Sequence, residues 1–258
     1  MFLIKIGGSV ITNKRELYTY RKDVVLRLAV ELALSEKSFV LVHGAGSYGH
    51  IIADETNLGV VDFSKEMLMP MAQVQMDVRR LNLKFMQDLK DAGLPVVSMP
   101  PGAMLTCSDG KIKEFDASLF KRYSKMGFNP VTFGDVVLDD ERGHVIISGD
   151  QIMEVLLDSM EFEKVAFIAD VDGIFTSNPA LDKDAELLEK VRPDQIDELC
   201  TNVHVSDVTG GMRNKLEAMA CMAKKGVDVH LLNGTIAGRL EKFLKGEHII
   251  GTVMEGQK

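Results

Sequence analysis

The sequence predicts an α/β fold whose mostly parallel central sheet is covered by helices on both faces. Short apolar runs alternate along the chain with longer stretches whose apolar residues recur at helical spacing. The runs are continuously apolar, which is typical of parallel strands buried on both faces. At 258 residues, the chain is long enough to form one large α/β unit.

Six apolar runs are predicted to be strands, and four stretches are predicted to be helices. The strands cover 2–6, 39–42, 95–99, 131–133, 165–169 and 227–232. The helices cover 24–32, 71–89, 152–156 and 212–223. A β-hairpin is expected over 135–147, because Asp139 to Gly143 supplies turn residues between two β-branched runs. We expect a single domain over 1–258, with lobes of about 1–155 and 156–258.

The composition excludes several classes of protein. Hydrophobic residues make up 46% of the chain and charged residues 26%, which rules out a disordered or fibrous protein. A net charge of −8 argues against nucleic acid as a partner, because bulk binding needs a basic face. The three cysteines are far apart and indicate neither disulfides nor a zinc site, so a reducing cytoplasm is expected. No signal peptide or apolar membrane span is evident.

Glycine-rich loops follow the first two predicted strands. Gly7-Gly8-Ser9 follows the first, and the segment 44–50 (GAGSYGH) follows the second. Ligands of open α/β sheets bind beyond the carboxyl ends of the strands, and glycine lets backbone N–H groups approach phosphate oxygens closely. Either loop alone could simply turn the chain, but two in one parallel sheet favour a phosphate-binding site.

Other nucleotide-binding motifs fit less well. The G-x-G-x-x-G pattern that begins at Gly44 is that of dinucleotide-binding proteins, and Asp62 lies at a suitable distance for a ribose contact. Asp62 has no clear preceding strand, however, so a dehydrogenase is the weaker interpretation. Protein-kinase motifs are absent, and Gly110-Lys111 lacks the context of a phosphate-binding P-loop.

Lysines near the glycines are candidate ligands for an anion. Lys5 interrupts an apolar strand two residues before Gly7, and a buried lysine is costly unless it meets an anion. Lys14 lies just beyond the first loop, and Lys215 follows a Thr-Gly-Gly segment at the start of a helix. Taken alone, each of these two lysines is more often a solvated surface residue than a site residue.

Carboxylates follow two other predicted elements. Asp150 precedes an apolar helix and is either its N-cap or a group that orients the lysines. Asp170-Val171-Asp172-Gly173 follows a buried strand and is either a β-turn or one wall of a nucleotide site.

Five segments together resemble the amino acid kinase superfamily. They are KIGGSVITNK (5–14), HGAGSYGH (43–50), ISGDQIM (147–153), ADVDGIF (169–175) and DVTGGMRNK (207–215), and they occur in the family's order over nearly the whole chain. The second segment, which ends in His50, is similar to that of the isopentenyl phosphate kinases within the superfamily. The resemblance implies an open αβα sandwich, a homodimer, and transfer of the γ-phosphoryl group of ATP, with Mg²⁺, to isopentenyl phosphate. The product would be isopentenyl diphosphate, an isoprenoid precursor.

The resemblance also implies roles for individual residues, with the acceptor on the N-terminal lobe and the nucleotide on the C-terminal lobe. The ATP site would comprise Lys5, Gly7, Gly8, Ser9, Gly46, Asp170, Gly173, Gly211 and Lys215. The acceptor site would comprise Ala45, Gly49, His50 and Gly149. Catalysis would depend on Lys5, Lys14, His50 and Asp150, with Lys14 stabilising the transferring group and Asp150 organising the lysines. No protein ligand for a metal is assigned.

Two positions depart from the family pattern. Ala45 stands where many relatives have glycine, and its methyl group is tolerable only at negative φ. Gln151 stands where a second acid is common, which leaves the role of Asp150 intact.

The five-carbon tail of the acceptor needs an apolar slot, since each buried CH₂ contributes about 0.8 kcal/mol. We expect Met71, Val74, Val136 and Ile146 to form it, although each could be ordinary core. A kinase for another phosphate or phosphonate acceptor, and an inactive nucleotide-binding regulator, remain alternatives.

Overall fold

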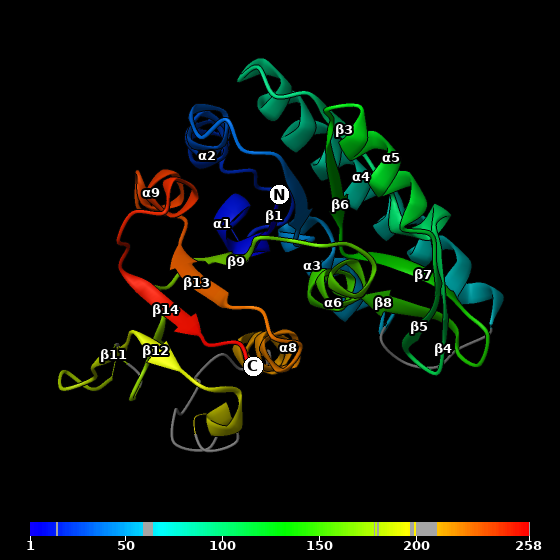
Figure 1. The fold of residues 1–258 in the computed structure, drawn as a ribbon. Coiled ribbons are helices and arrows are strands. Elements are labelled where there is room, and N and C mark those ends of the chain that lie inside the picture. The colour runs from blue at the N-terminus through cyan, green and yellow to red at the C-terminus, as the bar shows by residue number, and fades with distance from the viewer. Residues whose placement is uncertain are drawn as a thin grey trace.

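The computed structural model describes residues 1–13, 15–58, 64–177, 179, 181–196, 199 and 211–257. These residues form a central sheet of eight strands in the order β12-β14-β13-β9-β1-β2-β6-β3 (Figure 1). The strands are β1 (Phe2–Ile6), β2 (Phe39–His43), β3 (Val96–Ser98), β6 (Asn129–Phe133), β9 (Lys164–Ala169), β12 (Lys190–Val191), β13 (Val229–Asn233) and β14 (Gly251–Met254). Pairing is parallel throughout except between β13 and β14, so the predicted mostly parallel sheet is confirmed.

Helices cover both faces of this sheet. One face carries α1 (Gly8–Ile11), α2 (Lys22–Leu34), α4 (Leu68–Asp91) and α9 (Arg239–Lys245). The other carries α5 (Ser118–Lys125), α6 (Gly149–Ser159) and α8 (Gly211–Lys224). A further short helix, α3 (His50–Glu55), follows the second glycine loop. The predicted helices are all present; α5 and α9, which the sequence analysis did not predict, are short.

The alternation of side chains along β1 shows how the two layers are separated. Phe2, Ile4 and Ile6 pack with α2 and α9, whereas Leu3 faces α6 and α8. Successive side chains of a strand point to opposite faces, so Lys5 shares the face of Leu3. Fully buried strands of this kind account for the continuously apolar runs in the sequence.

A second sheet has the order β5-β4-β7-β8 and projects beside α4 (Figure 1). Strands β7 (Asp135–Asp139) and β8 (Gly143–Ile147) form the predicted hairpin. Strands β4 (Leu105–Ser108) and β5 (Lys111–Phe115) form another hairpin, which was not predicted. Its turn is Asp109-Gly110, with φ of 48° and 77°, a pair typical of tight hairpins.

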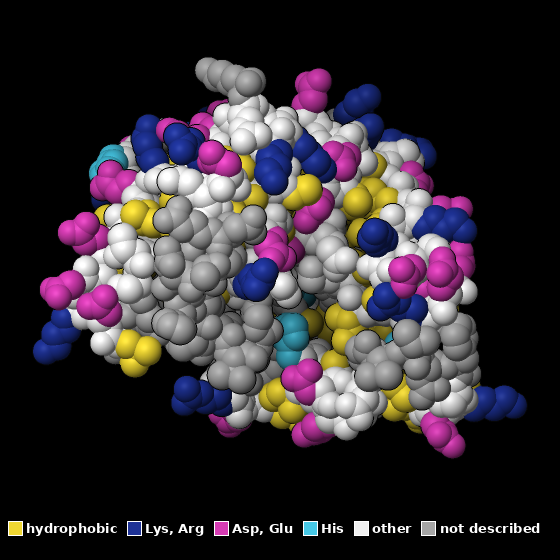
Figure 2. Space-filling model, turned by 90° about the horizontal axis from the view of Figure 1, so that it is seen from below, with side chains coloured by type: hydrophobic (Ala, Val, Ile, Leu, Met, Phe, Trp, Pro, Cys, Tyr) yellow, Lys and Arg dark blue, Asp and Glu magenta, His cyan; other side chains and the backbone are white. Residues whose placement is uncertain are grey.

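The remaining elements are short. They are η1 (Gly46–Tyr48), η2 (Lys65–Met67), η3 (Pro101–Ala103), η4 (Pro193–Gln195), β10 (Ile174–Phe175) and β11 (Leu187–Leu188). None of the helices formed by the described residues is both long and apolar enough to cross a membrane. On the face shown in Figure 2, acidic and basic side chains are interspersed.

Strand order identifies the crevice that can hold a ligand. Strand β2 lies on one side of β1 and strand β9 on the other, so the order in which strands are added to the sheet reverses at β1. In open α/β sheets, ligands bind beyond the carboxyl ends of the strands at such a switch point. Helices α6 and α8 lead into the parallel strands β9 and β13, so their first residues lie at this same edge.

Candidate active site

Glycines line the carboxyl edge of the sheet. A glycine directly follows each of β13, β1, β2 and β6, and each donates its N–H to a carbonyl at the end of the neighbouring strand. The pairs are Gly234 to Ala169 (2.8 Å), Gly7 to Ile168 (2.8 Å), Gly44 to Ile6 (3.0 Å) and Gly134 to His43 (3.2 Å). Together these four glycines line the sheet with backbone atoms at the switch point.

The two glycine loops touch through their backbones. A Cβ on Gly8 would lie 2.6 Å from the nitrogen of Gly46, and a Cβ on Gly44 would lie 2.5 Å from the nitrogen of Gly8. Real Cβ atoms do not approach so closely, so only glycine fits at both positions. The sequence predicted two loops at one edge; the structure brings them into direct contact.

Thr12 fastens the second loop to the first. Its hydroxyl donates to the carbonyl of Gly8 (2.8 Å) and accepts the N–H of Ser47 (3.0 Å). It lies so close to Gly46, whose φ is +50°, that a Cβ there would collide with it. Thr12 lies in the segment 5–14 but was not singled out, because its contacts with the second loop depend on the folded chain.

Ala45 occupies the glycine position without strain. Its φ is −69°, in the right-handed region, which meets the condition set for a methyl group at this site. Gly49 cannot be replaced in the same way, because its Cβ would lie 2.6 Å from that of Ala45. His50 follows as the first residue of α3 and is exposed.

Lys5 meets a carboxylate at the crevice. Its side chain, 10% exposed, forms an ion pair with Asp150 at the start of α6, and its Nζ lies 5.6 Å from the centre of the Phe167 ring. Gly149 allows the approach, because a Cβ there would lie 3.1 Å from Cε of Lys5. The buried lysine is therefore balanced by a partner on another element.

Ser148, not Asp150, is the N-cap of α6. The Ser148 hydroxyl accepts the N–H of Gln151 at 3.3 Å, and the Gln151 side chain accepts the N–H of Ser148 at 3.0 Å, which completes a capping box. The interpretation of Asp150 as the cap is therefore wrong, and its carboxylate is left to pair with Lys5. The departure at Gln151 has a structural reason, because this side chain closes the cap.

His43, the last residue of β2, is fully buried beside the second loop. Its Nδ1 lies 3.0 Å from the carbonyl oxygen of Gly44, and its Nε2 lies 3.1 Å from the amide nitrogen of Asn82. The ring lies between Phe85 and Phe133, with centroid distances of 5.1 and 5.2 Å. Burial lowers the pKa of His43 to about 4, so the ring is neutral at pH 7.

The residues expected to form the tail slot lie in one apolar cluster beside the second loop. Val74 and Val136 are buried in it, and Met71 and Ile146 pack against it while remaining partly exposed. Ala45 packs against the same cluster, so its apolar surface reaches the glycine loop.

Of the residues expected at the nucleotide site, Asp170 and Gly173 follow β9, close to the end of β13. Asp172 accepts hydrogen bonds from Asn233 (2.9 Å) and Arg239 (2.5 Å), which join the segment after β9 to the end of β13. Asp170 is exposed there, and a Cβ on Gly173 would lie 2.5 Å from the hydroxyl of Thr252.

Some predicted residues can be placed only by their element or not at all. Gly211 begins α8, and Lys215, partly exposed, lies one turn further along the same helix. Ser9 lies in α1, and its carbonyl accepts a hydrogen bond from Arg21 at 3.1 Å. Lys14 and Asp62 lie outside the described residues, as do 207–210 of the last motif.

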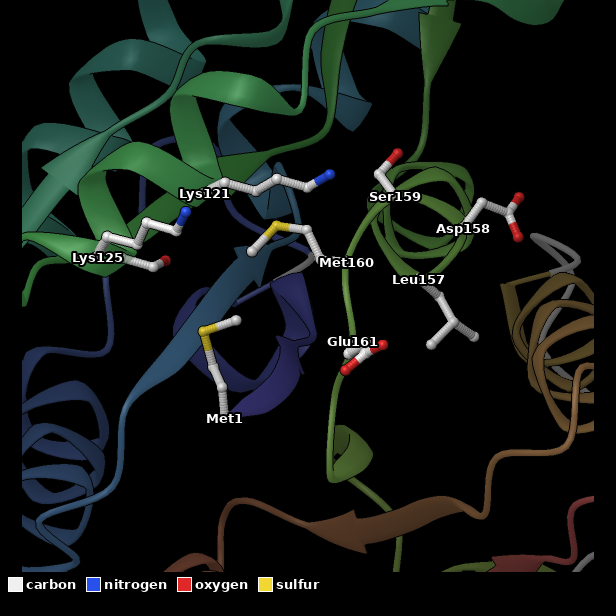
Figure 3. Close-up of a pocket in the computed structure, with 9 residues that line it drawn as sticks. Met1, Lys121, Lys125, Leu157, Asp158, Ser159, Met160 and Glu161 are labelled. Carbon is white, nitrogen blue, oxygen red and sulfur yellow. The ribbon is translucent and has the colours of Figure 1, made fainter.

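A large surface pocket lies away from all of these residues. It has a volume of about 670 Å³ and is lined by Met1 and by residues of α5 and of the end of α6 (Figure 3). Lys121 extends from α5 toward Ser159 of α6 (Figure 3). Because Met1 precedes β1, this pocket is at the opposite edge of the sheet from the glycines.

A sequence model described as the amino acid kinase family matches residues 1–233. The chain belongs to the amino acid kinase family. The sequence of this amino acid kinase is 37% identical to that of the isopentenyl phosphate kinase of Methanothermobacter thermautotrophicus, and the alignment covers all of both chains. It is 34% identical to the enzyme of that name from Thermoplasma acidophilum, over 98% of this chain and 100% of the relative. A solved structure titled as isopentenyl phosphate kinase superposes with a TM-score of 0.87 at 34% identity, covering 98% of this chain and 100% of that one.

Proposed function

We propose that this amino acid kinase transfers the γ-phosphoryl group of ATP to isopentenyl phosphate and so forms isopentenyl diphosphate. The proposal rests chiefly on the contact between the two glycine loops beside the Lys5–Asp150 pair. Full-length relatives named isopentenyl phosphate kinase, at 31–37% identity, identify the substrate class.

The residues of the crevice stabilise charge and hold the reactants in line. Phosphoryl transfer passes through a loose transition state, so catalysis depends on positioning and on charge stabilisation. Lys5, oriented by Asp150, contacts the ATP phosphates, and the first loop adds backbone N–H donors. Lys14 stabilises the transferring group, and Lys215 belongs to the nucleotide site with Gly211, Asp170 and Gly173.

The acceptor needs no catalytic base. A phosphate monoester has a second pKa near 6 and is mostly dianionic at pH 7, so its oxygen can attack directly. His50 then acts as a hydrogen-bond donor to this phosphate, beside the N–H groups of Ala45 and Gly46. The five-carbon tail packs against the cluster of Met71, Val74, Val136 and Ile146.

Mg²⁺ enters this scheme as MgATP. The described residues contain no group of three or more His, Cys, Asp or Glu side chains arranged to hold a metal ion. Mg²⁺ characteristically keeps several waters and binds through substrate phosphates, where it neutralises developing charge.

We also propose a cytoplasmic homodimer. Met69, Met76 and Leu83 lie seven residues apart along α4 and are 77%, 51% and 67% exposed, so they form an apolar stripe on one helix face. Strand β3 ends the sheet beside the same helix and offers an unpaired edge. A second copy would cover both features.

A coupled assay of ADP release tests the activity. Isopentenyl phosphate, other alkyl phosphates, a phosphonate, and carboxylate and alcohol acceptors are compared with MgATP. Turnover with isopentenyl phosphate at the highest kcat/KM is expected. Preference for a different phosphate or phosphonate would reassign the substrate, and ATP binding without turnover on any acceptor would identify a regulator.

A further inference from the structure

His43 belongs to the second glycine loop motif, yet the mechanism above does not use it. It is one of the few fully buried polar residues, and it contacts the loop backbone directly. The inference rests on the proposed function, in which the second loop binds a phosphate, and it concerns the effect of the His43–Gly44 contact on that binding.

The hydrogen bonds around His43 allow only one arrangement of protons. The carbonyl of Gly44 can only accept, so Nδ1 must donate to it. In a neutral ring, Nε2 is then an acceptor, and the amide of Asn82 must donate to it. The Asn82 oxygen therefore faces Ser98, whose hydroxyl donates at 2.6 Å. A chain of hydrogen bonds runs from Ser98 through Asn82 and His43 to Gly44.

These hydrogen bonds fix the plane of the peptide group between Gly44 and Ala45. In a trans peptide the C=O and the following N–H point in opposite directions. Because the Gly44 oxygen is held toward the buried ring, the N–H of Ala45 is directed to the other side. No hydrogen bond from this N–H is found among the described residues. Gly44 also packs on Gly8, so this peptide lies where the two loops meet.

We propose that His43 is a positioning residue, which as the neutral Nδ1–H tautomer holds the Gly44–Ala45 peptide so that the Ala45 N–H faces the phosphate crevice. Asn82 and Ser98 set the tautomer from the far side of the ring. An N–H fixed before the ligand arrives costs no reorganisation during the reaction, which is the basis of oxyanion-type stabilisation.

The tautomer is measured directly, without activity. Long-range ¹H–¹⁵N spectra of the histidine rings are recorded from pH 8 to 5.5, and the His43 signals are assigned by their loss in His43→Gln. A neutral ring protonated at Nδ1 throughout this range is expected. A ring protonated at Nε2, or one that titrates above pH 6, would overturn the proposal whatever the substrate is.

Two substitutions of His43 separate positioning from packing. The amide of Asn reaches the place of Nδ1, so His43→Asn can still donate to Gly44, whereas the amide of Gln reaches the place of Nε2. Both variants lose the ring between Phe85 and Phe133 and should be similarly destabilised. At equal folded fractions, kcat/KM for the acceptor is expected to fall about tenfold or more further in His43→Gln, in line with loss of an aimed donor. Equal kinetics in the two variants would contradict the proposal.

Asn82→Asp covers the case in which neither His43 variant folds. A carboxylate at this position can only accept a hydrogen bond, so a neutral His43 ring must carry its proton on Nε2. The substitution changes the side-chain volume little. The expected result is an Nε2-protonated ring together with reduced kcat/KM, and unchanged kcat/KM with that tautomer would refute the role.

His230→Gln is the matched control, because His230 is a second largely buried histidine, on β13 against Phe243. It should lose stability and keep kcat/KM. Absence of turnover in the wild type would count against the proposed function, while the spectra still decide the tautomer.

Discussion

At the scale of single residues, the pair of Lys5 and Asp150 joins the centre of the sheet to the start of α6. Lys5 comes from β1, Asp150 lies 145 residues away in sequence, and both side chains are mostly buried. Removal of one partner from a buried pair leaves an uncompensated charge. The lysine was predictable as an anomaly in an apolar strand, and Asp150 as a carboxylate that orients lysines. Their direct ion pair was not predictable, because nothing local in the sequence links the two residues.

Asp150→Asn is expected to lower kcat about tenfold or more, because Lys5 loses the carboxylate that orients it. Steady-state ADP release measures the effect, and thermal unfolding reports any loss of stability. Asp158→Asn on the same helix is the control, since Asp158 forms an exposed pair with Lys225 (2.6 Å) that contributes about 0–1 kcal/mol. Wild-type kcat in Asp150→Asn would exclude the orienting role.

His50→Ala is expected to raise KM for isopentenyl phosphate with little change in KM for ATP. A hydrogen bond to a charged group contributes about 1.5–3 kcal/mol, which corresponds to roughly a 10- to 150-fold change. His50→Gln keeps a donor and should recover part of the loss. Initial rates over both substrate concentrations separate the two constants, and unchanged values would remove His50 from the site.

Stability should fall as the pH is lowered from 7 to 5. Burial lowers the pKa of His43 and of His230 to about 4, against about 6.5 in the unfolded chain. Between these values the unfolded state binds more protons, so the free energy of unfolding decreases by at most about 1.4 kcal/mol per pH unit for each ring. Urea unfolding at several pH values measures the slope. His230→Gln should make it shallower, and an unaltered slope would show that His230 does not contribute.

At the scale of elements, the two glycine loops act as one unit. Gly8→Ala is expected to destabilise the protein and to abolish most activity, because the new methyl group would meet the backbone of Gly46. Gly93→Ala is the matched control: its φ of +87° imposes a cost, but nothing lies within 4 Å. Thermal unfolding and ADP release are compared, and equal activity in the two variants would show that the contact is dispensable.

The elements also show what a sequence can and cannot predict. The β7–β8 hairpin was predicted because Asp139 to Gly143 interrupts two β-branched runs. The β4–β5 hairpin was missed although Asp109-Gly110 is a strong turn signal, because the Lys111–Phe115 strand is largely exposed and lacks a continuous apolar run. The loops of the site could be predicted from glycine patterns, whereas the contacts of His43 and Asn82 depend on packing between distant elements.

At the scale of the whole molecule, strands from both halves of the sequence interleave in one sheet. Strands β1 and β2 come from the first half and β9 and β13 from the second, yet they are neighbours. The crevice therefore exists only when the halves are assembled. The parallel order was predictable from the apolar runs, but strand β14, which lies between β12 and β13, was not, because Gly251–Met254 is too short to show a period.

Leu83→Glu is expected to convert the proposed dimer into a monomer. A charge at the end of the exposed stripe of α4 would be buried without a partner on association. Sedimentation velocity over a range of concentrations measures the mass. Leu181→Glu, at an exposed leucine outside the stripe (77% exposed, against 67% for Leu83), should leave the mass unchanged. A wild type that stays monomeric at high concentration would contradict the dimer.

The close approach of Gly8 and Gly44 has a consequence for how this enzyme can be diversified. No side-chain atom can be added to Gly8 or to Gly44 at this contact. A chimeric enzyme should therefore take the segments that contain these two residues from the same parent protein. Chimeras that exchange only the chain between residues 13 and 43 would preserve the pair, whereas a single crossover within that range would combine Gly8 of one parent with Gly44 of the other.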